Sequence, residues 1–375
     1  MKVLLIGGTG LLSSEILSLC IQNSYDTYIL NRGNNNKHIK KLVKILIADF
    51  YNIESVEKVV KTINFDVVVD FISRKPENIN RIFPVFKDKC KQYVFISTAC
   101  VYRRSKEDGI ITEDSPKPNV DWSYSIEKYE SERTLIKLSK EAGVHYTIVR
   151  PYITYDNTRI PFGITPLYGY HWTIIGRILA EKPIFIWDKG EVITTLTRVE
   201  DFAKGVVGLF DNEKAYNQDF HIVTQETHTW KDFFEILFSL LNRTTEIVKI
   251  PAKNIVSQLP EYKGMLLGDR AINASFDNSK ILSAVKGLEF SVSLKEGLKR
   301  TIDYYKENNY LKGIDYSWDA KIDRLIANHT SIKISFTDYL GNVNKKDKIT
   351  YFIYRYLPVM LANKIMSVLH KINML

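Results

Sequence analysis

Cysteine is scarce in this chain of 375 residues, which contains only Cys20, Cys90 and Cys100. Their number is odd, they lie far apart, and each sits in or beside an apolar run, which indicates buried thiols in a reducing compartment rather than a disulfide framework. Their spacing matches no metal-ligand motif, so no metal site is expected.

A secretory signal layout is also lacking. The chain enters an apolar run at once, without the charged, apolar and small-residue regions of a signal peptide, so we expect a cytoplasmic protein. The net charge is +9, yet neither a recognition-helix signature nor interleaved aromatic and basic strands accompany it, which makes nucleic-acid binding a minor hypothesis. About five of these charges come from the end of the chain, through Lys345, Lys346, Lys348, Arg355, Lys364 and Lys371 against Asp347.

The first fourteen residues carry the clearest ligand signal. Residues 3–6 have the composition of a buried parallel strand, and Gly7, Gly8 and Gly10 separate them from a helical pattern over residues 11–20. Glycines at such a turn let a phosphate approach the amides of the helix N-terminus. The pattern predicts a dinucleotide pyrophosphate site. The alternative is an ordinary strand-to-helix turn, since Ser13 replaces the third glycine of the usual fingerprint.

Strand and helix patterns alternate through the first 150 residues. Further strands are expected at residues 27–30, 45–48, 67–71 and 93–97, and helices near residues 54–63 and 77–86. This alternation predicts an α/β fold with a Rossmann-type doubly wound parallel sheet. Ligands of such sheets bind beyond the carboxyl ends of the strands.

The residues that follow the second and third strands bear on the choice of cofactor. Asn31 and Arg32 stand where a carboxylate would bind the adenosine ribose of NAD. An arginine can neutralise a 2′-phosphate, so Arg32 modestly favours NADP, but an ordinary surface arginine would leave NAD or NADP open. Asp49 follows the third strand and would accept a hydrogen bond from the adenine amine.

A tyrosine and a lysine four residues apart suggest the chemistry. Tyr124 and Lys128 share one face of a helix expected to end near residue 142. An ammonium beside a phenol favours the phenolate and would lower the pKa of Tyr124 towards a working range. Ser97 and Thr98 end the fifth strand, and a hydroxyl there can hold a substrate oxygen.

These motifs together resemble the extended short-chain dehydrogenase/reductase superfamily, in its NAD-dependent epimerase/dehydratase branch, over about residues 1–310. The resemblance implies that Tyr124 is the catalytic acid/base, that Lys128 lowers its pKa, and that Thr98 is the hydroxyl partner. The motifs that carry it are residues 7–10, Asp49, residues 95–102, Tyr124 with Lys128, residues 150–155, residues 195–203 and residues 276–280. The cofactor residues we expect are Gly7, Thr9, Gly10, Leu11, Asn31, Arg32, Asp49, Phe50, Phe71, Ile72, Ser73, Ser97, Tyr124, Lys128 and Arg150.

Departures from the family pattern narrow the reaction. Sugar-nucleotide 4,6-dehydratases place Asp-Glu after the catalytic threonine, whereas this chain has Ala99 and Cys100, which argues against dehydration. UDP-sugar epimerases carry an arginine that binds the pyrophosphate, where this chain has Thr194, with Arg198 nearby. They also carry an asparagine after an Arg-Pro pair, where this chain has Ile153.

The second half should form a smaller substrate-binding lobe. We expect the nucleotide-binding domain at residues 1–150, completed by about residues 193–224, the lobe at residues 151–192 and 225–312, and an extension at residues 313–375. Residues 161–171 are rich in glycine, proline and aromatics, as in a loop over a pocket, and residues 172–179 return to a helix. Candidate substrate contacts are Thr98, Tyr155, Arg159, His171, Arg198 and Arg270.

The extension ends in a predicted amphipathic helix after Pro358. Its polar residues recur at spacings of three and four and are Asn363, Lys364, Ser367, His370 and Lys371. The helix would either lie on anionic lipid at the inner face of a membrane or dock on the body or on a second subunit. Its two lysines argue against a transmembrane span.

The sequence thus predicts an NAD(P)-dependent sugar-nucleotide epimerase that acts in surface polysaccharide biosynthesis. An NADP-dependent sugar-nucleotide ketoreductase is the first alternative. A non-catalytic nucleotide-binding or RNA-binding member of the superfamily is the second. The resemblance also implies a homodimer.

Overall fold

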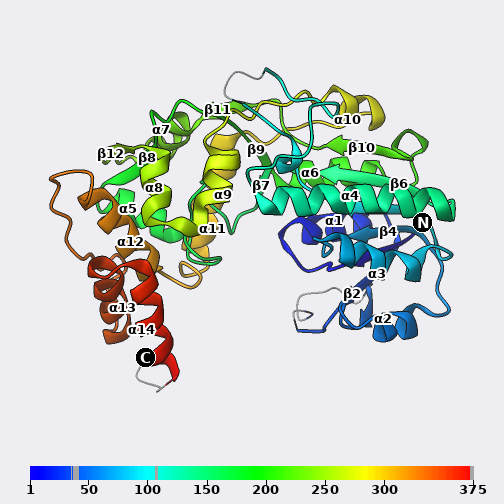
Figure 1. Cartoon of the computed structure of the whole chain (residues 1–375), viewed down its shortest axis with the longest axis horizontal. Helices are drawn as coiled ribbons and strands as arrows, with labels where there is room; N and C mark the ends of the chain where they lie inside the picture. Colours follow the sequence, from blue (N-terminus) through cyan, green and yellow to red (C-terminus); the bar gives the residue numbers. More distant parts are fainter. Residues whose placement is uncertain (35, 37–41, 106–108, 372–375) are drawn as a thin grey trace. The chain divides into compact units, whose positions relative to one another are not determined.

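The computed structural model describes residues 1–34, 36, 42–105 and 109–371 (Figure 1). The chain forms two compact units, each assembled from three segments. Unit 1 contains residues 1–154, 195–227 and 274–292, and unit 2 contains residues 155–194, 228–273 and 293–375.

A seven-stranded parallel sheet forms the centre of unit 1 (Figure 1). Its strands are β1 (Lys2–Ile6), β2 (Asp26–Asn31), β3 (Lys44–Ile47), β4 (Phe65–Asp70), β5 (Cys90–Ile96), β6 (His145–Arg150) and β10 (Gln218–His221). Their spatial order is β10-β6-β5-β4-β1-β2-β3, so the order reverses between β1 and β4. The predicted doubly wound Rossmann fold is confirmed.

Helices cover both faces of this sheet because the strands are apolar on both sides. The helices and 3-10 turns of unit 1 are α1 (Leu11–Gln22), α2 (Ile53–Val60), α3 (Pro76–Phe86), η1 (Ala99–Val101), α4 (Ser123–Ala142), α6 (Val199–Gly208), η2 (Glu213–Ala215) and α10 (Ser279–Ala284). Ile16 of α1 and Phe202 of α6 belong to the core on one face. Val56 of α2, Ile79 of α3 and Leu135 of α4 belong to the core on the other.

Unit 2 is mostly helical. Its elements are α5 (Trp172–Leu179), β8 (Ile184–Trp187), α7 (Trp230–Leu241), β12 (Ile247–Ile250), α8 (Ala252–Gln258), η3 (Pro260–Tyr262), α9 (Lys263–Met265), the π-helical turn η4 (Leu266–Arg270), α11 (Leu294–Glu307), α12 (Tyr316–Ala327), α13 (Lys345–Tyr356) and α14 (Val359–Lys371). Strands β8 and β12 pair in parallel. Phe162 packs between Trp187, Trp230 and Phe233 in an aromatic core. Three short strands, β7 (Ile153–Tyr155), β9 (Ile193–Arg198) and β11 (Thr227–Thr229), form a separate sheet in the order β11-β9-β7.

The observed units differ from the predicted boundaries at two places. Residues 274–292 group with unit 1, although the sequence predicts them in the substrate lobe. The physical reason is that Ile281, Ala284 and Leu288 are buried in the core beneath the sheet. Residues 313–375 are part of unit 2 rather than a separate extension.

A buried cluster of charges joins this last segment to the rest of unit 2. The side chains of Arg177, Asp319 and Asp323 are fully buried, and Arg177 Nη1 lies 2.5 Å from Asp319 Oδ1 and 2.6 Å from Asp323 Oδ1. Lys182 Nζ lies 2.8 Å from Asp319 Oδ2 and 2.6 Å from Asp323 Oδ2. Two cations therefore neutralise two carboxylates, and α12 is held to the segment that contains α5.

Tyrosines complete the same cluster. Tyr339 donates to Asp319 Oδ1 at 2.7 Å, and Tyr351 of α13 donates to Asp323 Oδ2 at 2.6 Å. Burial by itself would raise the pKa of Asp319, but Arg177 and Lys182 outweigh it and hold that pKa below its usual range. Helix α13 is thereby anchored to the body of unit 2.

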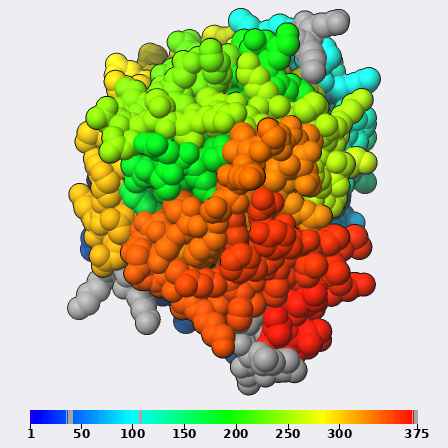
Figure 2. Space-filling view, turned by 90° about the vertical axis from the view of Figure 1, so that its left-hand side faces the viewer, coloured from blue at the N-terminus to red at the C-terminus, as the bar shows by residue number. Residues whose placement is uncertain are grey.

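The predicted C-terminal helix is present as α14. Ala362 and Met366 are buried, whereas Asn363, Lys364 and Ser367 are exposed, so the helix docks one face on unit 2. Helices α13 and α14, in red tones, lie on the face of the unit that Figure 2 shows. The last residues of the predicted range, 372–375, lie outside the described residues. Among the residues described, every helix is too short or too polar to cross a bilayer.

The charge cluster predicts a large effect from one substitution. Asp319→Asn should lower the free energy of unfolding by about 3–5 kcal/mol, because it leaves buried Arg177 and Lys182 with one carboxylate. Asp303→Asn, which breaks the exposed pair with Lys299, should cost less than about 1 kcal/mol. Denaturant unfolding of both variants checks this, and equal stabilities would show that the cluster does not hold unit 2 together.

Candidate active site

The glycine turn after β1 has the geometry that the sequence predicts. Gly7 has a φ of +89°, and a Cβ there would lie 2.8 Å from Ile72 Cγ1, so only glycine fits without strain. Ser13 is buried, and its hydroxyl donates to Gly7 O at 2.9 Å and accepts from Gly10 N at 2.8 Å. The serine in place of the third glycine therefore braces the turn from within. Helix α1 begins at Leu11, and its first amides point beyond the carboxyl end of β1.

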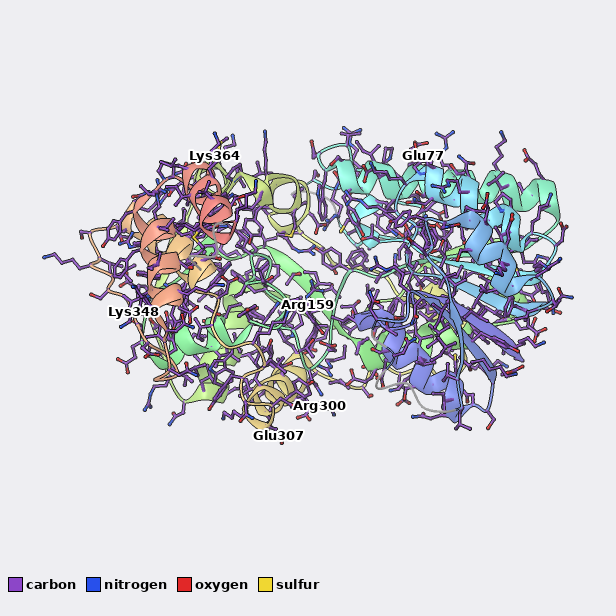
Figure 3. The ribbon with its side chains drawn as sticks, turned by 90° about the horizontal axis from the view of Figure 1, so that it is seen from below. Glu77, Arg159, Arg300, Glu307, Lys348 and Lys364 are labelled. Atoms are coloured by element: carbon purple, nitrogen blue, oxygen red, sulfur yellow. The ribbon has the colours of Figure 1, made fainter. Side chains whose placement is uncertain are left out.

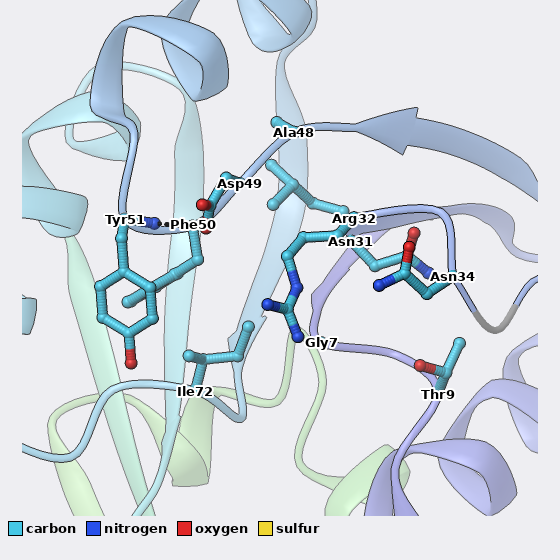
Figure 4. A pocket seen from close by; sticks show the side chains of 11 residues that line it. Gly7, Thr9, Asn31, Arg32, Asn34, Ala48, Asp49, Phe50, Tyr51 and Ile72 are labelled. Carbon is cyan, nitrogen blue, oxygen red and sulfur yellow. Dashed lines mark hydrogen bonds between the residues drawn. The ribbon is translucent and has the colours of Figure 1, made fainter. Parts of the chain in front are cut away.

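A pocket of about 350 Å³ opens beside this turn (Figure 4). The expected residues that line it are Gly7, Thr9, Asn31, Arg32, Asp49, Phe50 and Ile72. Leu30, Asn34, Ala48 and Tyr51 complete it, and no sequence motif singles them out. The walls come from the ends of β1, β2, β3 and β4, where the strand order reverses.

Arg32 and Asp49 give this pocket one cation and one carboxylate. The Arg32 guanidinium points into the pocket (Figure 4). Asp49 Oδ1 accepts from Tyr51 N at 3.1 Å, which fixes the carboxylate at the rim. Asn31 is turned to the loop after β2, since its amide donates to Asn36 and its carbonyl accepts from Gly33 N. Asn31 thus shapes the pocket wall.

The structure brings Tyr124 and Thr98 together at the carboxyl end of β5. Thr98 caps η1 by accepting from Cys100 N at 3.2 Å, and it lies close enough to Tyr124 to affect the pKa of the phenol. Burial raises the pKa of Tyr124 above its ordinary value, although Arg74 and Thr98 act in the opposite direction. The pair can pass a proton to or from a substrate hydroxyl. Burial also raises the pKa of Cys100, so its thiol stays protonated beside this pair.

Lys128, which the sequence predicts to act on Tyr124, is bonded to backbone carbonyls of the sheet edge. Its ammonium donates to the backbone carbonyls of Ser73 at 2.7 Å and Ile96 at 2.8 Å and lies 4.6 Å from the Phe95 ring centroid. Burial lowers the pKa of Lys128 to about 8. Lys128 therefore links the loop after β4 to the end of β5, and its predicted effect on the pKa of Tyr124 stays a prediction.

Arg74 is the cation that faces Tyr124, and the sequence motifs do not reveal it. Its Cζ lies 5.2 Å from the Tyr124 ring centroid, and its Nε lies 2.7 Å from Glu127 Oε2. The charge of Arg74 lowers the pKa of Tyr124 against the larger effect of burial. The sequence signal that could have revealed Arg74 is its position directly after the loop that follows β4.

Two expected cofactor residues are engaged elsewhere. Ser97 donates to Glu132 Oε1 at 2.5 Å. Arg150 is buried in a bidentate pair with Glu132, at 2.9 and 2.7 Å, and its Nη1 lies 2.5 Å from Asp219 Oδ2. The polar atoms of Ser97 and Arg150 are bonded to Glu132, because α4 places this carboxylate beside the ends of β5 and β6. The other expected residues on this side are backbone or wall positions: Leu11 begins α1, Phe71 follows β4, and buried Ser73 supplies its carbonyl to Lys128.

Two of the candidate substrate arginines are already paired. Arg198 is buried and forms a bidentate pair with Glu200, at 2.9 and 2.6 Å. Arg270 pairs with the neighbouring Asp269, and its carbonyl accepts from Trp187 Nε1. Each guanidinium thus already has a carboxylate partner, and the substrate contacts of Arg198 and Arg270 stay predictions.

Three further candidates belong to unit 2. Tyr155 is fully buried. His171 accepts from Ile160 N at 3.0 Å, and burial lowers its pKa to about 4, so the imidazole is a neutral structural group. Arg159 is the exposed member of the three (Figure 3).

Sequence comparison relates the chain to known proteins. The model of the NAD dependent epimerase/dehydratase family matches residues 3–222. The chloroplast stem-loop binding protein of 41 kDa b of Arabidopsis thaliana is 26% identical over 235 residues, which cover 59% of this chain and 58% of that protein. The chain thus spans less than two thirds of the length of that relative. A putative UDP-glucose 4-epimerase of Methanocaldococcus jannaschii is 25% identical over 334 residues, 82% of this chain and 99% of that protein.

Solved structures share the fold. The UDP-glucuronic acid 4-epimerase of Bacillus cereus in complex with NAD superposes with a TM-score of 0.65 at 18% identity, covering 82% of this chain and 97% of that one. The UDP-glucose 4-epimerase of Thermus thermophilus, also with NAD, gives 0.63 at 17% identity, covering 82% and 99%.

The lowered pKa of Lys128 predicts that the free energy of unfolding depends on pH. Its pKa of about 8 in the folded chain lies below the value of an unfolded lysine, so between about pH 8 and 10 the unfolded chain holds more protons. The free energy of unfolding should therefore gain a contribution on the order of 1–3 kcal/mol as the pH rises through this window, which reflects release of the buried charge.

The measurement is urea unfolding at pH 7.5, 8.5 and 9.5. Lys128→Met should lose this contribution, and Lys137→Gln, at an exposed lysine of the same helix, should keep it. Identical pH profiles for the protein and Lys128→Met would show that Lys128 keeps an ordinary pKa.

Proposed function

Because the chain belongs to the NAD dependent epimerase/dehydratase family, we propose that it is an NAD(P)-dependent sugar-nucleotide epimerase with Tyr124 as its acid/base. The observation that carries this proposal is the proximity of Thr98 and Tyr124 at the end of β5, in the same unit as the pocket beside Gly7. UDP-sugars are the substrate class we propose, since several similar proteins are named for UDP-glucose or UDP-glucuronic acid.

The residues of unit 1 fit a dinucleotide. A side chain at Gly7 would fill the approach to the turn, the first amides of α1 can receive a pyrophosphate, and Arg32 and Asp49 can contact the adenosine half. A bound NAD(P) would supply hydride acceptance and return at the sugar carbon. Tyr124 would take the proton of the sugar hydroxyl and give it back, while Thr98 orients that hydroxyl. Arg74 would stabilise the tyrosinate, since its charge favours the ionised phenol.

Two other functions are alternatives to the epimerase. An NADP-dependent sugar-nucleotide ketoreductase would use the same residues and exchange its cofactor after each turnover. A non-catalytic RNA-binding member is the second alternative, because the Arabidopsis relative is a stem-loop binding protein. A homodimer, a cytoplasmic location and a role in surface polysaccharide synthesis remain predictions from the sequence.

The cofactor retained by the purified protein separates these alternatives. Denaturing the protein and identifying the released dinucleotide should yield NAD or NADP in stoichiometric amount for an epimerase. A site that binds NADPH reversibly would favour the ketoreductase, and a site that binds neither would favour the non-catalytic alternative.

Removing the Tyr124 hydroxyl should abolish most of the turnover. Tyr124→Phe should lower kcat by about 10²–10⁴-fold and change dinucleotide affinity by less than about tenfold, because the proton transfer is lost and the pocket is kept. Turnover of UDP-glucose and UDP-glucuronic acid by coupled assay measures this. Tyr129→Phe on the same helix is the matched control and should retain activity. An active Tyr124→Phe enzyme would overturn the proposed mechanism.

Arg32 should determine cofactor preference. Arg32→Ala should weaken binding of NADPH by about 10–100-fold and of NADH by about twofold or less, because a charge-assisted bond to the 2′-phosphate contributes about 1.5–3 kcal/mol. Fluorescence titration with both cofactors measures the ratio. Arg133→Ala, at an exposed arginine outside the pocket, is the control. An equal loss for both cofactors would mean that Arg32 does not read the 2′-phosphate.

A further inference from the structure

Helices α13 and α14 expose large apolar side chains. The exposed fractions are 47% for Phe352, 70% for Tyr356, 73% for Met360, 46% for Leu361 and 56% for Val368. Scattered single apolar residues are normal on a protein surface, but these five lie on two consecutive helices of one segment. Figure 2 shows this surface, in red tones.

Lysines accompany these side chains at helical spacing. Lys345, Lys348, Phe352 and Tyr356 recur at intervals of three and four, so they share one exposed face of α13. On α14, Lys364 and Lys371 lie on the same side of the helix as Met360 and Val368, opposite buried Ala362 and Met366. Lys348 and Lys364 lie on the outside of the two helices (Figure 3). We call these two exposed faces together the C-terminal face.

The C-terminal face is held in this orientation. Tyr351 is buried and anchors α13 through its bond to Asp323, while Lys348 and Phe352 remain exposed. Tyr354 donates to Asn363 Oδ1 at 2.8 Å, which joins α13 to α14. The apolar side chains of α13 therefore cannot turn inward without breaking the buried bond between Tyr351 and Asp323.

A small pocket lies at the start of α14 and adds two cations to this face. It has a volume of about 270 Å³, and its walls include Lys321, Arg324, Pro358 and Met360. Glu261 lies 3.1 Å from Lys321, and Arg324 also donates to the Leu357 carbonyl. One carboxylate thus faces two cations, which leaves the pocket net positive beside an exposed methionine.

We propose that the C-terminal face binds the surface of an anionic phospholipid bilayer. The apolar side chains would enter the acyl boundary, while the lysines stay at the level of the phosphates and the pocket beside Arg324 receives a headgroup. The segment from Lys345 to Lys371 carries six basic residues and one acidic residue. A second copy of the same face would therefore bring like charges together, whereas an anionic surface complements them.

Vesicle sedimentation of the full chain tests the proposal. Vesicles of phosphatidylcholine with 30 mol% phosphatidylglycerol (about one third anionic lipid) should bind the protein, and pure phosphatidylcholine should bind it at least about tenfold more weakly. Binding should fall steeply between about 0.05 M and 0.5 M NaCl, because salt screens the lysines. Lys364→Gln with Lys371→Gln should weaken binding by about 30-fold, at about fivefold for each lysine.

Two further variants separate the roles of the face. Met360→Ser with Leu361→Ser should also weaken vesicle binding, since it removes the inserted side chains. Lys58→Gln with Lys61→Gln, at exposed lysines of unit 1, and Leu167→Ser are matched controls and should bind as the unmodified protein does. All variants should keep their dinucleotide affinity, so this outcome is independent of the proposed enzymatic function.

Absence of binding to anionic vesicles at low salt would overturn the proposal. So would equal binding of the lysine variant and the unmodified protein. If light scattering showed that Met360→Ser with Leu361→Ser turns a dimer into a monomer without changing vesicle binding, the face would be a contact between two copies of the chain.

Discussion

Polar contacts between α4 and the carboxyl edge of the central sheet hold the arrangement of unit 1, and the Lys128 side chain is central to them. It joins one turn of α4 to the carbonyls of Ser73, in the loop after β4, and of Ile96, the last residue of β5. Ser131 continues this attachment through Arg74 O, and Glu132 completes it through Ser97 and Arg150. Helix α4 is therefore fixed by polar contacts over its first half. Tyr124 is placed over the end of β5 as a result, within reach of Thr98.

Both units contain buried ion pairs, and the pairs fix a different part of the structure in each unit. In unit 1 the pair of Arg150 and Glu132 fixes the helix that bears Tyr124. In unit 2 the pairs of Arg177 with Asp319 and Asp323 fix the last segment of the unit to its first segment. In each case an unpartnered buried charge would be costly, so the polar clusters favour one packing arrangement over others.

Much of the fold follows from local sequence, and less of the site does. The strand, glycine turn and helix around Gly7 are predictable because each signal is local in the chain, and the family prediction is confirmed. The pairing of Arg150 with Glu132 is hidden in the sequence, because the two residues lie eighteen positions apart and meet only in the folded chain. Arg74 escapes prediction because its neighbour Tyr124 is fifty residues away. The attachment of α12 and α13 is equally hidden, since Arg177 and Asp319 belong to segments with no shared motif.

The division of each unit into three chain segments has a consequence for synthesis on the ribosome. Strand β10 closes one edge of the sheet, and Ile281 and Leu288 belong to the core on the face that α1 covers. At about 5–20 residues per second, many seconds separate the emergence of β1 from that of these residues. During that interval the nascent sheet exposes apolar surface that no segment yet made can cover. The core of unit 1 is thus complete only after more than two thirds of the chain has been made.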